Sequence, residues 1–109
     1  MKDNSSVNNF SPEIIAPEVA VTKVNQGALL VDLRTPREIQ EGSIPGATFI
    51  NAEEISSRLH EFGDNKEREI VLYCKSGGRC DYVGQILKQI GYPNVFNALG
   101  YTDLKDHIK

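Results

Sequence analysis

The sequence has little cysteine and little histidine, and both shortages exclude a class of protein. Two cysteines in 109 residues are too few for a disulfide scaffold. Cys74 and Cys80 are six positions apart, and His60 and His107 stand at no finger-like spacing from them. A structural zinc site of the usual tetrahedral kind is therefore not expected.

Positive charge and long apolar runs are also in short supply. The net charge is -3, and because nucleic-acid binding usually needs a basic face, no nucleic-acid partner is expected. No apolar run approaches the length that spans a membrane, so no membrane association is expected. Residues 1–9 are polar and lack the apolar segment of a signal peptide. We expect a flexible tail over residues 1–11 and a cytoplasmic protein, or a periplasmic one if a signal peptide was removed.

The remaining composition is that of an ordinary globular protein. Apolar residues make up 39% of the chain and charged residues 25%. A chain of this length suits one domain with one modest core, which we expect over residues 12–109.

Short apolar runs alternate with helical stretches along this domain. Strands are expected over residues 13–15, 28–33, 48–50, 70–73 and 94–96. Helices are expected from Pro17 to Gly27, from Thr35 to near Gly42, over 52–62, from Arg79 or Cys80 to Gly91, and over 101–108. Strands that alternate with helices predict an α/β fold, a small parallel sheet of about five short strands flanked by helices.

The stretch YCKSGGRC around Cys74 carries the most specific chemical signal. Cys74 ends the strongest predicted strand, where ligands bind in parallel sheets. The helix that follows begins with unpaired N–H groups and partial positive charge. Gly77 and Gly78 would let the backbone bend so that these N–H groups converge. With the charges of Lys75 and Arg79, this predicts a lowered Cys74 pKa and an attraction for small anions.

Each of these residues also has an ordinary structural interpretation. A buried cysteine is often a small apolar core residue, and two glycines can form a simple strand-to-helix turn. Inert cysteines are rare in electropositive glycine-rich turns, which favours a reactive Cys74. A solvated surface charge stays an open alternative for Lys75 and is a weaker one for Arg79.

Three ordered segments of the chain match one known family. They read LLVDLRTPREIQEGSIPGATFIN, IVLYCKSGGRC and LKQIGYPNVFNALGY. From about residue 12 onward the chain resembles the rhodanese domain, the thiosulfate sulfurtransferase fold, in its single-domain forms such as the short phage-shock type. The resemblance implies that Cys74 takes up sulfur as a persulfide, with the backbone of Lys75, Ser76, Gly77, Gly78, Arg79 and Cys80 around it.

Asp32 and Arg34 match the D-x-R pattern that supports the active-site side in this family. For both residues we expect structural hydrogen bonding and pairing with Glu38. The motif departs from the family at Ser43, where histidine is common, and at Gly100, where no tryptophan follows.

The activity that this resemblance implies is sulfur transfer in two half-reactions. Sulfane sulfur would pass from thiosulfate, or a persulfide donor, through Cys74 to cyanide, a thiol or a sulfur-accepting protein, with ping-pong kinetics and no metal or organic cofactor. Two alternatives stay open. One is a sulfur carrier or redox module that serves a partner protein. The other is a cysteine phosphatase or arsenate reductase, whose arginine follows the cysteine by six positions, whereas Arg79 follows Cys74 by five.

Cys80 stands where the family loop commonly has serine, and two hypotheses describe it. It could be a resolving thiol that attacks persulfidated Cys74, forms a disulfide and releases sulfide. Alternatively, it replaces the serine and is idle. Because a loop whose N–H groups point inward tends to point its side chains outward, we favour the idle thiol.

Overall fold

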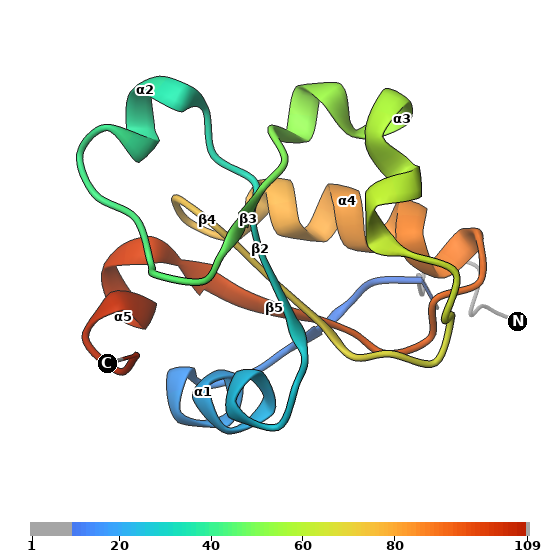
Figure 1. The fold of residues 1–109 in the computed structure, drawn as a ribbon, viewed down its shortest axis with the longest axis horizontal. Coiled ribbons are helices and arrows are strands. Elements are labelled where there is room, and N and C mark those ends of the chain that lie inside the picture. The colour runs from blue at the N-terminus through green and yellow to red at the C-terminus, as the bar shows by residue number, and fades with distance from the viewer. Residues whose placement is uncertain (1–9, 109) are drawn as a thin grey trace, which may run out of the picture.

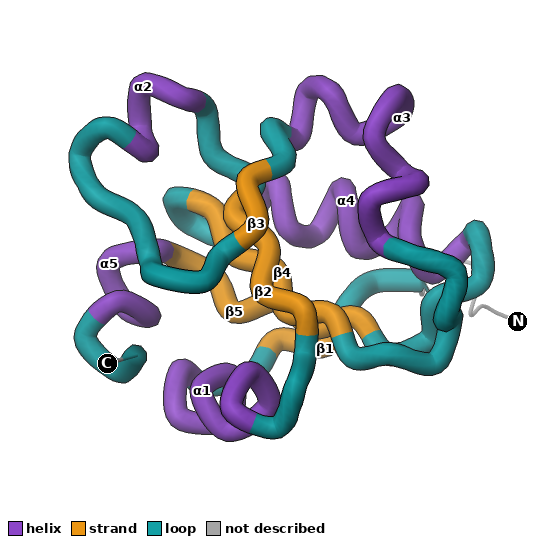
Figure 2. The backbone as a smooth tube through the Cα atoms, viewed as in Figure 1, coloured by secondary structure: helices purple, strands orange, loops and turns teal. Residues whose placement is uncertain are grey.

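The computed structural model describes residues 10–108, and a parallel sheet runs through its centre (Figures 1 and 2). Its strands are β1 (Glu13–Ile14), β2 (Leu29–Asp32), β3 (Thr48–Phe49), β4 (Ile70–Cys74) and β5 (Val95–Gly100). Their order is β1-β5-β4-β2-β3, and each neighbouring pair is parallel. The α/β fold with a small parallel sheet is thereby confirmed. Most of the predicted tail, residues 1–9, lies outside the described residues.

Helices cover both faces of this sheet. They are α1 (Pro17–Asn25), α2 (Pro36–Ile39), α3 (Ile55–Arg58), α4 (Gly78–Gln89) and α5 (Tyr101–Lys105). In Figure 1, α1 and α5 lie on one side of the sheet, and α3 and α4 lie on the other. Within the described residues, no helix combines the length and the apolar character that crossing a membrane requires.

Strand β4 shows why the apolar run before Cys74 is continuous. All five of its residues are buried, because helices cover both faces of the sheet. Ile70, Leu72 and Cys74 pack into the core cluster beneath α3 and α4. Val71 and Tyr73 pack into the second cluster, beneath α1 and α5. Cys74 therefore points to the face that α4 covers, at the carboxyl end of the central strand.

Several predicted boundaries differ from the structure. The segment 52–62 is not one helix: tight 3-10 turns over Ala52–Glu54 and Leu59–Phe62 flank α3, as is common at helix ends. The apolar residues of this segment nevertheless face the core, since Ile55 and Phe62 are both buried. The other four helices also differ from their predicted limits: α1, α2 and α5 end earlier, and α4 runs from Gly78 to Gln89.

The largest error concerns the last strand. A strand was expected over residues 94–96, yet β5 continues to Gly100. Asn97 and Gly100 are typical turn residues, so the pattern indicated an end to the strand. In the fold the Asn97 side chain is buried and hydrogen-bonded. Because its polar atoms have partners, asparagine is tolerated inside this buried strand.

Candidate active site

The residues that follow β4 bring backbone N–H groups to one sulfur atom. We call residues 75–80 the Cys74 loop; it includes the first turn of α4. The Gly77 N–H donates to Cys74 Sγ at 2.9 Å. The backbone N–H groups of Cys80 and Ser76 also help to lower the pKa of Cys74. Cys74 itself is only 1% exposed, so its sulfur lies beneath the loop.

Gly77 and Gly78 play different structural parts. Gly77 has φ +106°, and a Cβ on it would lie 2.7 Å from Leu99 Cδ2. Both the backbone conformation and the lack of space therefore require glycine there. A Cβ on Gly78 would meet no atom of the described residues within 4 Å. The left-handed conformation in the loop is at Gly77, and Gly78 is the first residue of α4.

Asn97 holds the loop from below, and the sequence analysis missed it. Its Nδ2 donates to the Gly77 carbonyl oxygen at 3.1 Å, and its Oδ1 accepts the Leu99 N–H at 2.8 Å. Leu99 itself has φ +66°, a costly conformation for a leucine. The signal was an asparagine inside the apolar stretch VFNAL, since a buried polar side chain needs specific partners.

The sequence predicts that the Cys80 side chain points away from the site, but in the structure it lies beneath the loop. It is fully buried in the first turn of α4, and its Sγ is 4.0 Å from the Leu99 carbonyl oxygen. Its thiol also interacts with the Cys74 sulfur and lowers the pKa of that residue. A thiol has one proton, and a thiolate is a stronger acceptor than a neutral carbonyl. We therefore assign the proton to the Cys80–Cys74 contact when Cys74 is ionised.

These contacts change the acidity of both thiols. The Cys80 thiol, followed by the loop N–H groups, lowers the Cys74 pKa to about 5, although burial opposes the shift. The neighbouring Cys74 sulfur and burial raise the pKa of Cys80. The two shifts favour a thiolate at Cys74 and a neutral thiol at Cys80.

Arg79 is not a free cation. Its guanidinium contacts both carboxylate oxygens of Glu38, at 2.7 and 2.9 Å. Arg79, with help from Thr35, lowers the Glu38 pKa to about 2. The expected positive charge at the mouth of α4 is therefore balanced by a carboxylate from α2.

Asp32 and Arg34 form a separate ion pair, and it is buried. Arg34 donates from Nε and Nη2 to the Asp32 carboxylate, and its guanidinium lies 4.1 Å from the Tyr101 ring centroid. The expected structural hydrogen bonding is present, but the pairing with the Glu38 side chain was wrong. Arg34 reaches only the backbone carbonyl of Glu38, at 3.4 Å, because Arg79 takes the carboxylate.

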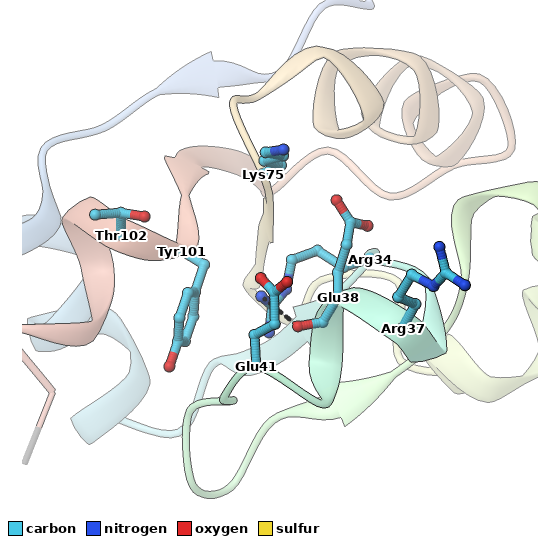
Figure 3. A pocket seen from close by; sticks show the side chains of 7 residues that line it. All are labelled: Arg34, Arg37, Glu38, Glu41, Lys75, Tyr101 and Thr102. Atoms are coloured by element: carbon cyan, nitrogen blue, oxygen red, sulfur yellow. Dashed lines mark hydrogen bonds between the residues drawn. The ribbon is translucent and has the colours of Figure 1, made fainter.

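Two cavities flank the Glu38–Arg79 pair. The first, of about 270 Å³, is shown in Figure 3 and is lined by Arg34, Arg37, Glu38, Glu41, Lys75, Tyr101 and Thr102. The second, of about 340 Å³, is lined by Ala52, Glu53, Ile55, Ser56, Arg79 and Tyr82. The exposed Lys75 reaches the first cavity from the Cys74 loop, opposite the residues of α2 (Figure 3). One partner of the ion pair thus lines each cavity.

Comparison with known proteins decides the family. The model of the rhodanese-like domain matches residues 16–105. The chain belongs to the rhodanese-like domain family. The fold described above is accordingly the rhodanese fold, and the resemblance in the three sequence segments is confirmed.

Relatives of this rhodanese-like domain include enzymes and a carrier. A sulfurtransferase of Allochromatium vinosum is 38% identical over 94 residues, which cover 86% of this chain and 83% of the relative. The thiosulfate sulfurtransferase PspE of Escherichia coli is 30% identical over 74 residues, which cover 68% of this chain and 71% of the relative. The putative sulfur carrier protein YrkF of Bacillus subtilis is 30% identical over 89% of this chain and 52% of its own length. The human single-domain sulfurtransferase TSTD1 superposes with a TM-score of 0.70 at 27% identity, over 85% of this chain and 94% of that chain.

Proposed function

We propose that this rhodanese-like domain is a sulfurtransferase that carries sulfane sulfur on Cys74. The observation that carries the proposal is the set of N–H and S–H donors around one buried sulfur atom. A thiolate is the nucleophilic form of cysteine, and these donors keep Cys74 ionised at neutral pH. Family membership and the sulfurtransferase relatives support the same reaction.

Thiosulfate and persulfides are the two classes of sulfur donor for this reaction. The Cys74 thiolate attacks the outer sulfur of thiosulfate, the S–S bond breaks, and sulfite leaves with the electron pair. The product is a Cys74 persulfide, whose charge the N–H groups of the Cys74 loop stabilise. An acceptor thiolate or cyanide then attacks the outer sulfur and restores the Cys74 thiolate, which gives ping-pong kinetics.

Intact-protein mass spectrometry tests this reaction. After mixing with thiosulfate, the parent protein should gain one sulfur atom, and cyanide should remove it. Cys74→Ser should gain none, whereas Cys80→Ser, which removes the other thiol, should still gain it. Sulfur uptake that persists in folded Cys74→Ser would exclude Cys74 as the carrier.

A second candidate function is delivery of sulfur to a partner protein. The similarity to YrkF, a putative sulfur carrier, favours it. The chemistry at Cys74 is the same, and only the acceptor differs. Turnover with cyanide or small thiols supports the enzyme, whereas persulfide transfer that requires a protein acceptor supports the carrier.

A further inference from the structure

The Glu38–Arg79 pair is placed where an anionic donor would bind. Arg79 is the fifth residue after Cys74 and the second residue of α4, in the turn that closes the Cys74 loop. Its guanidinium uses two N–H groups on Glu38, in the side-by-side geometry that guanidinium groups also use for oxyanions. An oxyanion that arrives at Cys74 therefore competes with an internal carboxylate.

Glu38 is held in this position from its own side. Its Oε1 accepts the Thr35 N–H at 2.9 Å and the Thr35 hydroxyl at 3.1 Å, while the Thr35 hydroxyl accepts the Glu38 N–H. This capping box fixes the first turn of α2 and aims the carboxylate at the loop. Glu38 is thus an oriented side chain and not a surface charge that meets Arg79 by chance.

The pair is also accessible enough to open. The side chains of Glu38 and Arg79 are 23% and 31% exposed, and ion pairs with such access to water are weak. Cavities lie on both sides, so a released Arg79 side chain has space in which to turn. The Asp32–Arg34 pair, at 0% and 4%, has no such access.

We propose that Glu38 is a specificity-determining residue, whose carboxylate occupies the anion-binding face of Arg79 and must be displaced by a charged sulfur donor. The inference rests on the sulfur transfer proposed above. Doubly charged thiosulfate has to break the ion pair in order to use Arg79. A persulfide donor with no oxyanion has no need of Arg79 and bears no such cost. Glu38 therefore selects against oxyanion donors and in favour of persulfides of thiols that carry no oxyanion.

Glu38→Gln is the direct test, because it removes the charge and keeps an amide oxygen for the Thr35 contacts. We expect the KM for thiosulfate to fall about three- to tenfold, the range that a weak ion pair allows, with little change for the persulfide of 2-mercaptoethanol, which carries no oxyanion. Glu41→Gln removes the same charge from the same cavity and reports the general electrostatic effect. A fall with Glu41→Gln as large as that with Glu38→Gln would overturn the proposal.

A second readout does not depend on turnover. Sodium sulfate, an unreactive oxyanion, should protect Cys74 from alkylation by neutral iodoacetamide at constant ionic strength. Glu38→Gln should lower the half-protecting sulfate concentration about three- to tenfold in the parent protein and leave it unchanged in an Arg79→Ala background. Equal effects in both backgrounds, or no effect in either, would show that Glu38 does not act through Arg79.

The two readouts also separate this inference from the proposed function. If no variant gains sulfur from thiosulfate, the proposed donor is wrong, while sulfate protection still reports the competition at Arg79. If Glu38→Gln does not fold, Glu38→Asp keeps the charge but shortens its reach to Arg79. It should then also lower the half-protecting sulfate concentration, and an unchanged value would contradict the proposal.

Discussion

Two sets of residues surround Cys74, and they differ in their access to water. The framework consists of buried residues that hold the site: Asp32, Arg34, Gly77, Cys80 and Asn97. The rim consists of exposed or half-exposed residues: Glu38, Lys75, Gly78 and Arg79. Each set contains an arginine that contacts a carboxylate through more than one nitrogen. The same kind of contact is permanent in the framework and exchangeable in the rim, because burial decides what it costs to separate the charges.

The largest effect should separate the two ion pairs. Asp32→Ala leaves the Arg34 charge buried without its partner and should lower the free energy of unfolding by about 3–5 kcal/mol. Glu38→Ala leaves Arg79 in contact with water and should lower the free energy of unfolding by about 1 kcal/mol. This value includes the lost contribution of Glu38 to the cap of α2. Urea denaturation of both variants measures the difference. Similar losses in the two variants would mean that framework and rim are not distinct.

The two glycines give the next comparison. Gly77→Ala forces an alanine into a left-handed conformation and against Leu99, and should cost about 2–5 kcal/mol. Gly78→Ala adds a methyl group in open space at the start of α4 and should change stability by no more than about 1 kcal/mol. Thermal unfolding checks both, and a destabilised Gly78→Ala would show that the rim carries structural strain as well.

The smallest effect concerns the acidity of Cys74. Cys80→Ala removes a donor to the thiolate and should raise the Cys74 pKa by about one to two units above its value of about 5, as expected for one hydrogen bond to a charged group. Cys80→Ser keeps a donor, so it should shift the pKa less and keep most thiosulfate turnover. Ultraviolet thiolate absorbance against pH measures this shift. Lys75→Ala is the matched rim variant and should move the pKa less than Cys80→Ala does.

The direction of the pH effect on stability follows from the same value. The Cys74 pKa is lower in the folded protein than the value of about 8.5 for a free cysteine. Its contribution to stability is therefore complete above about pH 8.5 and is lost as the pH falls toward 5. Cys74→Ser should flatten this part of the stability profile. An equal slope in both proteins would contradict a depressed folded-state pKa.

The sequence predicted the parts of the site that are local in the chain. The strand that ends at Cys74 and the helix after it follow from a short apolar run and two glycines. The helix that begins after Thr35 was likewise predicted, and in the structure Thr35 and Glu38 form a capping box at its start. Contacts between distant segments could not be predicted in this way. The pairing of Arg79 with Glu38 depends on where α2 meets α4, because the two residues are 41 positions apart in the chain.

The contacts of buried side chains could not be predicted from the sequence either, as Cys80 and Asn97 show. The helical position of Cys80 was nearly right, but the direction of its side chain depends on the path of β5 beneath it. The predicted length of β5 was itself too short, because asparagine, as at Asn97, is more common in turns than in strands. The partners of a buried polar group come from tertiary packing, which a single sequence does not display.

The burial of the Cys74 sulfur acts as a size filter on the electrophiles that reach it. At 1% exposure, the thiolate is shielded from bulky alkylating agents and oxidants that cannot pass the loop. A sulfane sulfur bound in the transfer proposed above would place the reactive atom one S–S bond, about 2 Å, beyond the Cys74 sulfur. In the sulfur transfer proposed above, the buried cysteine would be the permanent nucleophile and the persulfide the transient group that an acceptor attacks.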